Sequence, residues 1–143
     1  MVSAHDVAAY IIERHGPLSA MKLQKLIYYA QAWSLVWDDR QLFREPVEAW
    51  SNGPVVRSVY ENHRGQFEVR GWPWGDSRLL DGDARATVDA VLDFYGPRTA
   101  QYLSDLTHSE EPWKEARQGL PDGERGASEI SLATMAEYYG SLQ

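Results

Sequence analysis

The sequence predicts a mainly α fold, a compact single-domain helical bundle around one central helix with minor short β-strands. The length of 143 residues suits one domain, so residues 1–143 are treated as a single domain. The chain is 43% hydrophobic and has 6 Trp, 8 Tyr and 3 Phe, enough apolar side chains for a substantial core. The third observation is the segment 19–37, which is strongly apolar, has helical spacing and contains no Gly or Pro.

The central helix is expected over about residues 19–37. Its apolar positions fall on one helical face: Leu23, Leu26, Ile27, Ala30, Trp33 and Trp37. Ser19 suits the N-cap, because its hydroxyl can accept a hydrogen bond from a free backbone N–H of the first turn. Lys22 and Lys25 lie near the helix start, where the helix dipole disfavours cations. Helix stability therefore does not explain these two lysines.

The segment before the central helix is predicted to form a short helix. Ser3 and Asp6 have the spacing of a capping box, and the helix that follows should end at Gly16-Pro17. After the central helix, Leu42 and Phe43 are expected to anchor a loop in the core.

Residues 47–50 alternate apolar and polar side chains, which is a weak strand signal. Asn52-Gly53 is typical of a turn. Pro54 is expected at the first position of the next helix, because proline suits that place. That helix should end before Gly65, a candidate for the left-handed position after a helix.

Residues 66–83 are the least regular part of the chain, with a possible short strand at Phe67 and Val69. We expect a surface loop held down by Trp72 and Trp74. Because Trp is enriched at binding hot spots, these two side chains are candidates for partner binding, although most Trp residues of such a chain belong to the core.

The remaining elements are predicted from their caps and apolar spacing. The expected helices are one capped by Asp81 or Asp83, one capped by Thr99, one or two turns from about Pro112, and a last helix after Ser131. Residues 119–126 are expected to form a polar loop.

The charge pattern bears on the kind of partner. The net charge is −7, and residues 104–143 hold eight acids and three bases, a net of −5. No basic stripe of the kind that nucleic-acid binders carry is present, so we expect no direct binding of nucleic acid. The acidic C-terminal part suits a basic protein partner or is an ordinary solvated surface. Lys22 and Lys25, three residues apart, are likewise a second candidate binding patch or a solvated helix start.

Motifs for catalysis, cofactors or metals are missing from the sequence. There are no cysteines, no HExxH, no GxSxG elbow and no glycine-rich phosphate loop. His108 could bind a metal only if distant residues joined it and its neighbouring acids, so we interpret it as a helix-end histidine bonded to backbone or carboxylate. We therefore expect no enzyme activity, no cofactor and no metal. Without a signal peptide or a membrane-length apolar run, we expect a cytoplasmic chain that does not contact membrane.

Three blocks together resemble one family. They are KLQKLIYYAQAW, EAWSNGPVVRSVY and THSEEPW, beginning at Lys22, Glu48 and Thr107. Their order and separation resemble the Panacea domain of SocA-like antitoxins and of phage-associated, GepA-like proteins. The matching residues are called signature positions below: Lys22, Leu23, Lys25, Leu26, Tyr28, Trp50, Gly53, Pro54, Val55, His108, Pro112 and Trp113.

The resemblance implies a small helical domain with minor β content and a role as an antitoxin. Such a protein neutralises a cognate toxin, encoded beside it, by direct protein–protein binding. SocA-like members also act as adaptors that deliver the toxin to the ClpXP protease, which is the first alternative. A phage-related enzyme of unknown chemistry is the second alternative, and it would require a concave site with perturbed acids or histidines.

Overall fold

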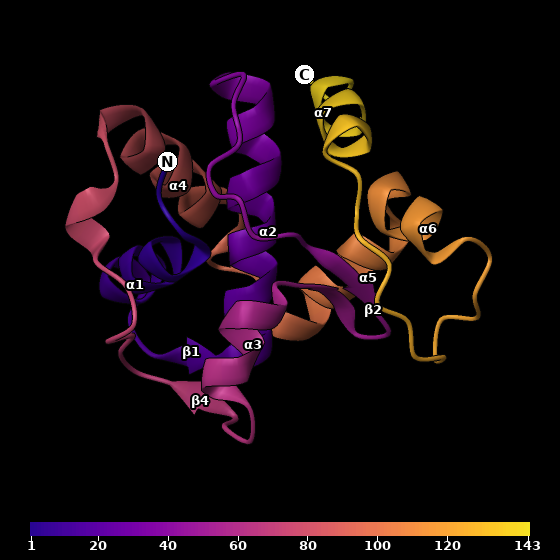
Figure 1. Ribbon diagram of the computed structural model, residues 1–143, viewed down its shortest axis with the longest axis horizontal. Helices are drawn as coiled ribbons and strands as arrows, with labels where there is room; N and C mark the ends of the chain where they lie inside the picture. The colour runs from indigo at the N-terminus through magenta and orange to yellow at the C-terminus, as the bar shows by residue number, and fades with distance from the viewer.

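The computed structural model describes residues 1–143 and shows a mainly helical fold with few short strands, as predicted. Helix α2 (Ala20–Trp37) runs through the middle, and the other elements surround it (Figure 1). In that view α1 and α4 lie on one side of α2, while α6 and α7 lie on the other. In the same view the N-terminus lies near α4 and the C-terminus lies at the end of α7.

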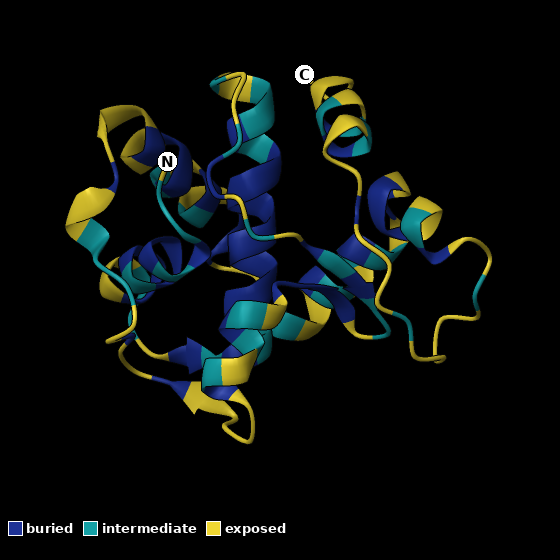
Figure 2. Ribbon diagram, viewed as in Figure 1, coloured by how far each residue is buried: buried dark blue, intermediate teal, exposed yellow.

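Helix α2 is the core of the molecule, as its sequence predicts. The Ser19 hydroxyl accepts from Lys22 N at 3.1 Å, which confirms the expected N-cap. Leu23, Leu26 and Ile27 are completely buried, and Figure 2 shows most of α2 in the buried colour. Its last residue differs from expectation, since Trp37 is 44% exposed, although its ring stacks on Trp33.

Helix α1 (Ala4–His15) begins with the predicted capping box, in which Ser3 and Asp6 hydrogen bond reciprocally. It is followed by β1 (Leu18–Ser19), which pairs antiparallel with β4 (Glu68–Val69). Strand β4 confirms the strand expected near Phe67 and Val69. Strand β1 was not predicted, because two residues are too few to show an alternating pattern.

The prediction that Pro54 begins a helix is wrong. Strand β2 (Glu48–Trp50) pairs with β3 (Gly53–Val55), so Pro54 lies inside a tight antiparallel hairpin. Gly53 has φ +120°, a conformation that glycine adopts easily and that returns the chain onto β2. Helix α3 (Arg57–His63) begins only after this pairing ends, and Gly65, with φ +83°, follows it as predicted.

The second half of the chain is helical and follows the predicted caps. Asp81, Thr99 and Ser131 each accept a hydrogen bond from the first turn of the helix that follows. The elements are η1 (Ser77–Leu79), α4 (Gly82–Tyr95), α5 (Ala100–Ser109), α6 (Glu111–Arg117) and α7 (Leu132–Gly140).

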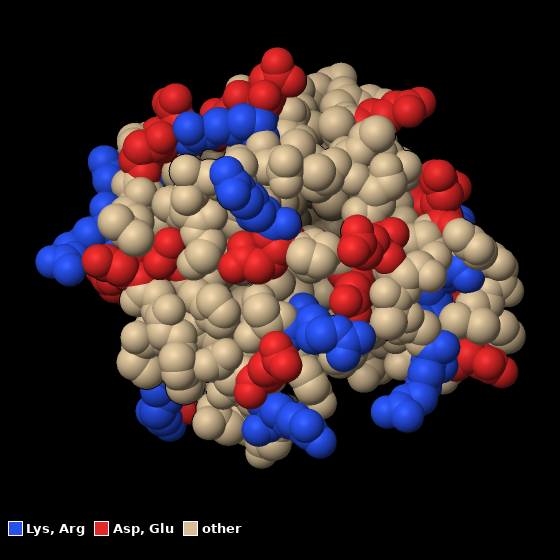
Figure 3. All heavy atoms as spheres, in the orientation of Figure 1, with Lys and Arg blue, Asp and Glu red and all other residues tan.

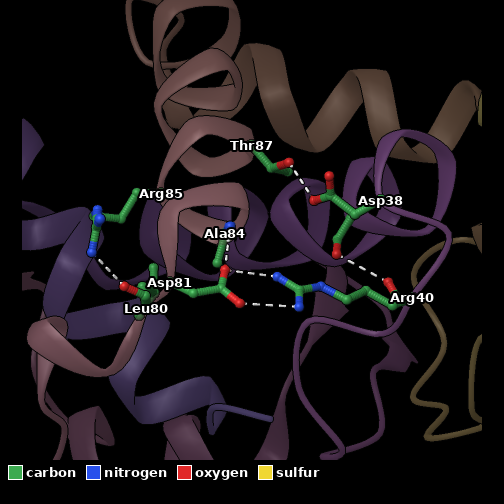
Figure 4. A network of polar contacts seen from close by, with 8 residues as sticks. Asp38, Arg40, Leu80, Asp81, Ala84, Arg85 and Thr87 are labelled. Carbon is green, nitrogen blue, oxygen red and sulfur yellow. Dashed lines mark hydrogen bonds and ion pairs between the residues drawn. The ribbon is translucent and has the colours of Figure 1, made fainter.

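Polar contacts fix the segment after α2 against the start of α4 (Figure 4). The Arg40 guanidinium makes two hydrogen bonds to Asp81, at 2.8 and 3.1 Å, and Asp81 also caps Ala84 N. The Thr87 hydroxyl donates to Asp38 at 2.7 Å. Arg40 lowers the pKa of Asp81 to about 2, so this tie persists across ordinary pH.

Two buried glutamines of α2 hold irregular chain segments in the core. Gln31 accepts from Leu42 N at 2.7 Å and donates to Phe43 O at 2.8 Å. Gln24 accepts from Val56 N at 2.9 Å in the same manner. Because buried backbone groups must be hydrogen bonded, these side chains replace the missing partners of the loops.

Candidate functional site

The three sequence blocks meet in space beside α2. A Cβ placed on Gly53 would lie 2.5 Å from Lys25 Cε and 3.2 Å from Thr107 Oγ1. The turn of the β2–β3 hairpin therefore packs directly on the Lys25 side chain and on α5. Any side chain at position 53 would collide with Lys25, which gives a steric reason for glycine here in addition to its positive φ.

The third block and the helix α5 that leads into it also contact the hairpin. Trp113 Nε1 donates to Trp50 O at 2.9 Å, and the Ser104 hydroxyl donates to Asn52 O at 3.0 Å. The His108 ring stacks on Trp113, with 4.1 Å between ring centroids. His108 Nε2 is buried without a hydrogen-bond partner, so this nitrogen lacks the expected bond to backbone or carboxylate.

Lys25 is a buried amine without a partner. Its side chain is 1% exposed, and its Nζ makes no hydrogen bond. Burial lowers the pKa of Lys25 to about 7. A charge buried without a counter-ion costs folding free energy, so this lysine reduces stability. It also cannot form part of a surface patch, and its predicted place in one beside Lys22 is wrong.

Lys22 remains accessible, and the fold explains its place at a helix start. Its Nζ donates to Gly96 O at 2.6 Å, at the C-terminal end of α4. A cation is favoured at that end by the helix dipole. A tertiary contact with α4 therefore offsets the unfavourable position of Lys22 in α2, which the sequence alone left unexplained.

The two tryptophans of the loop between β4 and η1 have different environments. Trp72 is only 6% exposed, and its Nε1 donates to His5 Nδ1 at 3.1 Å. The prediction of Trp72 as an exposed binding residue is therefore wrong, because the loop folds this ring into the core beside α1. Trp74 is 51% exposed and stays a candidate for partner binding.

The signature positions lie mainly in the interior. None of them is in the exposed class, and only Lys22, Trp50 and His108 are half-buried. The others are buried: Leu23, Lys25, Leu26, Tyr28, Gly53, Pro54, Val55, Pro112 and Trp113. Most residues that carry the family resemblance thus build the fold, and only the three half-buried ones are accessible to a partner.

A second buried polar cluster was missed by sequence reasoning. The Glu110 carboxylate accepts from the hydroxyls of Tyr29, at 2.7 Å, and Tyr139, at 2.8 Å. Tyr139 in turn hydrogen bonds the Tyr28 hydroxyl at 2.9 Å. Burial raises the pKa of Glu110, and these hydroxyls partly oppose that rise. The available signal was the pair of tyrosines on the inner face of a buried helix, since buried hydroxyls require partners.

No cluster of three or more His, Cys, Asp and Glu residues is placed to hold a metal ion. No helix has the length and apolar character needed to cross a membrane. On the face shown in Figure 3, basic and acidic side chains are interspersed, without a basic patch.

Comparison with known proteins identifies one family. Residues 23–114 match a family model described as antitoxin SocA-like, Panacea domain. All signature positions except Lys22 fall within this range. No curated protein and no solved structure matches the chain.

Proposed function

This chain belongs to the SocA-like antitoxin family with a Panacea domain, and on that premise we propose that it is the antitoxin of a toxin–antitoxin pair. It neutralises its cognate protein toxin by binding it directly, without turnover. The single observation that carries this proposal is the family match over residues 23–114, most of the chain.

The structure supports a binding role rather than a catalytic one in two respects. The cations Lys25 and Arg117 are buried in the interior, and His108 is half-buried with its ring stacked on Trp113. The surface instead carries large exposed apolar side chains, such as Trp74, which suit contact with another protein. The net charge of −7 favours a toxin with a basic surface.

The proposal is tested by co-expression with the small gene encoded beside this one. Expression of that gene alone should arrest growth, and co-expression of this chain should restore it. The two purified proteins should co-elute as a complex of fixed stoichiometry. Growth arrest that persists despite full expression of the folded chain contradicts the proposal.

A second arm separates neutralisation by binding from delivery to the ClpXP protease. Toxin activity is measured with purified toxin and purified chain, with no protease present. Inhibition in this mixture is expected if binding is sufficient. If inhibition requires ClpXP and ATP, the chain acts as an adaptor instead.

A further inference from the structure

A groove of about 460 Å³ lies along the C-terminal half of α2, between this helix, α4 and α5. Nine of its ten lining residues are hydrophobic. The lining includes Trp33 and Trp37 of α2, Phe94 and Tyr95 of α4, and Tyr102 and Leu106 of α5. Its walls are helical, so it presents side chains rather than a free strand edge.

The rim of this groove gathers apolar side chains that the fold leaves uncovered. Phe94 is 59% exposed, Leu142 54%, Tyr102 47% and Trp37 44%. These are four of the nine large apolar residues that the whole chain exposes. Such a gathering of uncovered aromatic surface around one concavity is typical of a site for a protein partner.

Glu110 is the one charged residue in the lining. Both of its hydrogen bonds, from Tyr29 and Tyr139, go to Oε1, which leaves Oε2 without a partner. None of the ion pairs in the structure includes Glu110. The groove therefore presents one carboxylate oxygen, fixed in place by two tyrosines, within an otherwise apolar surface.

Arg98 is a basic side chain at the rim of the groove, where it contacts aromatic rings. Its guanidinium lies over the rings of Phe94 and Tyr102, 5.4 and 5.1 Å from their centroids. Its guanidinium thus contacts these rings and forms no ion pair with Glu110. A base for Glu110 has to come from outside the chain.

We propose that the groove binds an amphipathic helix of the cognate toxin, with a Lys or Arg of that helix paired to Glu110. This inference rests on the proposed function and adds the binding surface and the chemistry of the partner. Helical walls and an open apolar rim suit a helix laid into a groove, anchored by apolar residues at i, i+3, i+4 and i+7. A basic residue among those anchors would complement the single carboxylate.

The apolar part of the proposal is tested with the toxin that co-purifies with the chain. Affinity is measured by calorimetry for Phe94→Ala and Tyr102→Ala, with Phe67→Ala as the control. Phe67 is 84% exposed and lies beside the start of α2, where its carbonyl accepts from Ala20 N, far along the helix from the groove. We expect at least a tenfold loss of affinity for each groove variant and no change for the control.

The charge is tested with Glu110→Gln, which keeps an acceptor for Tyr29 and Tyr139 but removes the negative charge. A thermal melt first verifies that this variant is folded. It should bind the toxin at least tenfold more weakly. The loss should vanish when one Lys or Arg of the toxin is also replaced by Gln, because paired charges give non-additive effects.

Three results would contradict the proposal that the groove binds the toxin. If affinity is unchanged in Phe94→Ala and Tyr102→Ala but falls in Trp74→Ala, the toxin binds another surface. The proposed function is then unaffected. A wild-type dimer that Phe94→Asp converts to monomers assigns the groove to a second copy of this chain. If the wild-type chain binds no toxin at all, both the proposed function and the groove proposal are contradicted.

Discussion

At the scale of the residue, Lys25 is a cation buried without a partner, and its pKa falls from 10.5 to about 7 on folding. Between these values the unfolded chain binds more protons than the folded one. The free energy of unfolding should therefore rise with pH across this window, by at most about 1.4 kcal/mol per pH unit. Below pH 7 the full cost of the buried charge is present.

The variant Lys25→Met tests this cost. It replaces the buried amine with an apolar side chain of similar length, so it should melt above the wild type at pH 7 and lose the rise in stability from pH 7 to 10. Lys114→Met, at an exposed lysine, is the control and should keep that rise. A Lys25→Met protein that melts below the wild type at pH 7 would show that the amine stabilises the fold.

Trp72 and Trp74 give a second residue-scale prediction. Trp72→Ala should lower the free energy of unfolding by about 3–5 kcal/mol, because it removes a buried ring and leaves a cavity beside α1. Trp74→Ala, at a ring that is 51% exposed, should change it far less. Urea denaturation of both variants measures the difference. Equal losses of unfolding free energy would contradict the burial of Trp72 and the exposure of Trp74.

At the scale of the element, α2 should dominate stability. Leu26 and Ile27 are completely buried within the core. Leu26→Ala or Ile27→Ala should each cost about 2–5 kcal/mol of unfolding free energy. A loss below about 0.5 kcal/mol, the range of surface substitutions, would refute the central position of this helix.

The helices were predictable because their signals are local. Caps such as Ser19 and Thr99 and the apolar spacing of α2 lie within a few residues of what they specify, and the structure confirms them. The β2–β3 hairpin depends on pairing, which overrode the preference of Pro54 for a helix start. Local propensity cannot show which strand a short segment will meet.

The candidate site was only partly predictable for the same reason. The sequence identified the three blocks, and the structure shows that they meet around Gly53. Which candidate residues are accessible depends on tertiary contacts. Trp72 is buried in the core beside α1, and Lys25 is covered by the hairpin. The groove joins Trp37, Phe94 and Leu142, which are far apart in the chain, so no sequence window contains it.

At the scale of the whole molecule, the signature positions and the rim of the proposed groove are separate. The signature positions build the packed interior between α2, the hairpin and the α5–α6 pair. The exposed rim of the proposed groove, formed by Trp37, Phe94, Tyr102 and Leu142, lies outside this set and can change with little effect on the core. Such an arrangement suits a domain whose fold is common to a family while each member recognises its own partner.

Neutralisation of a toxin by stoichiometric binding, as proposed for this chain, is tested most directly by an activity titration. Purified toxin at a fixed concentration is mixed with increasing amounts of the chain, with no protease present. Toxin activity should fall linearly, reach its minimum at the stoichiometry of the isolated complex, and recover fully once the two proteins are separated. Permanent loss of toxin activity at a small fraction of that stoichiometry would contradict the account and indicate an enzymatic antitoxin.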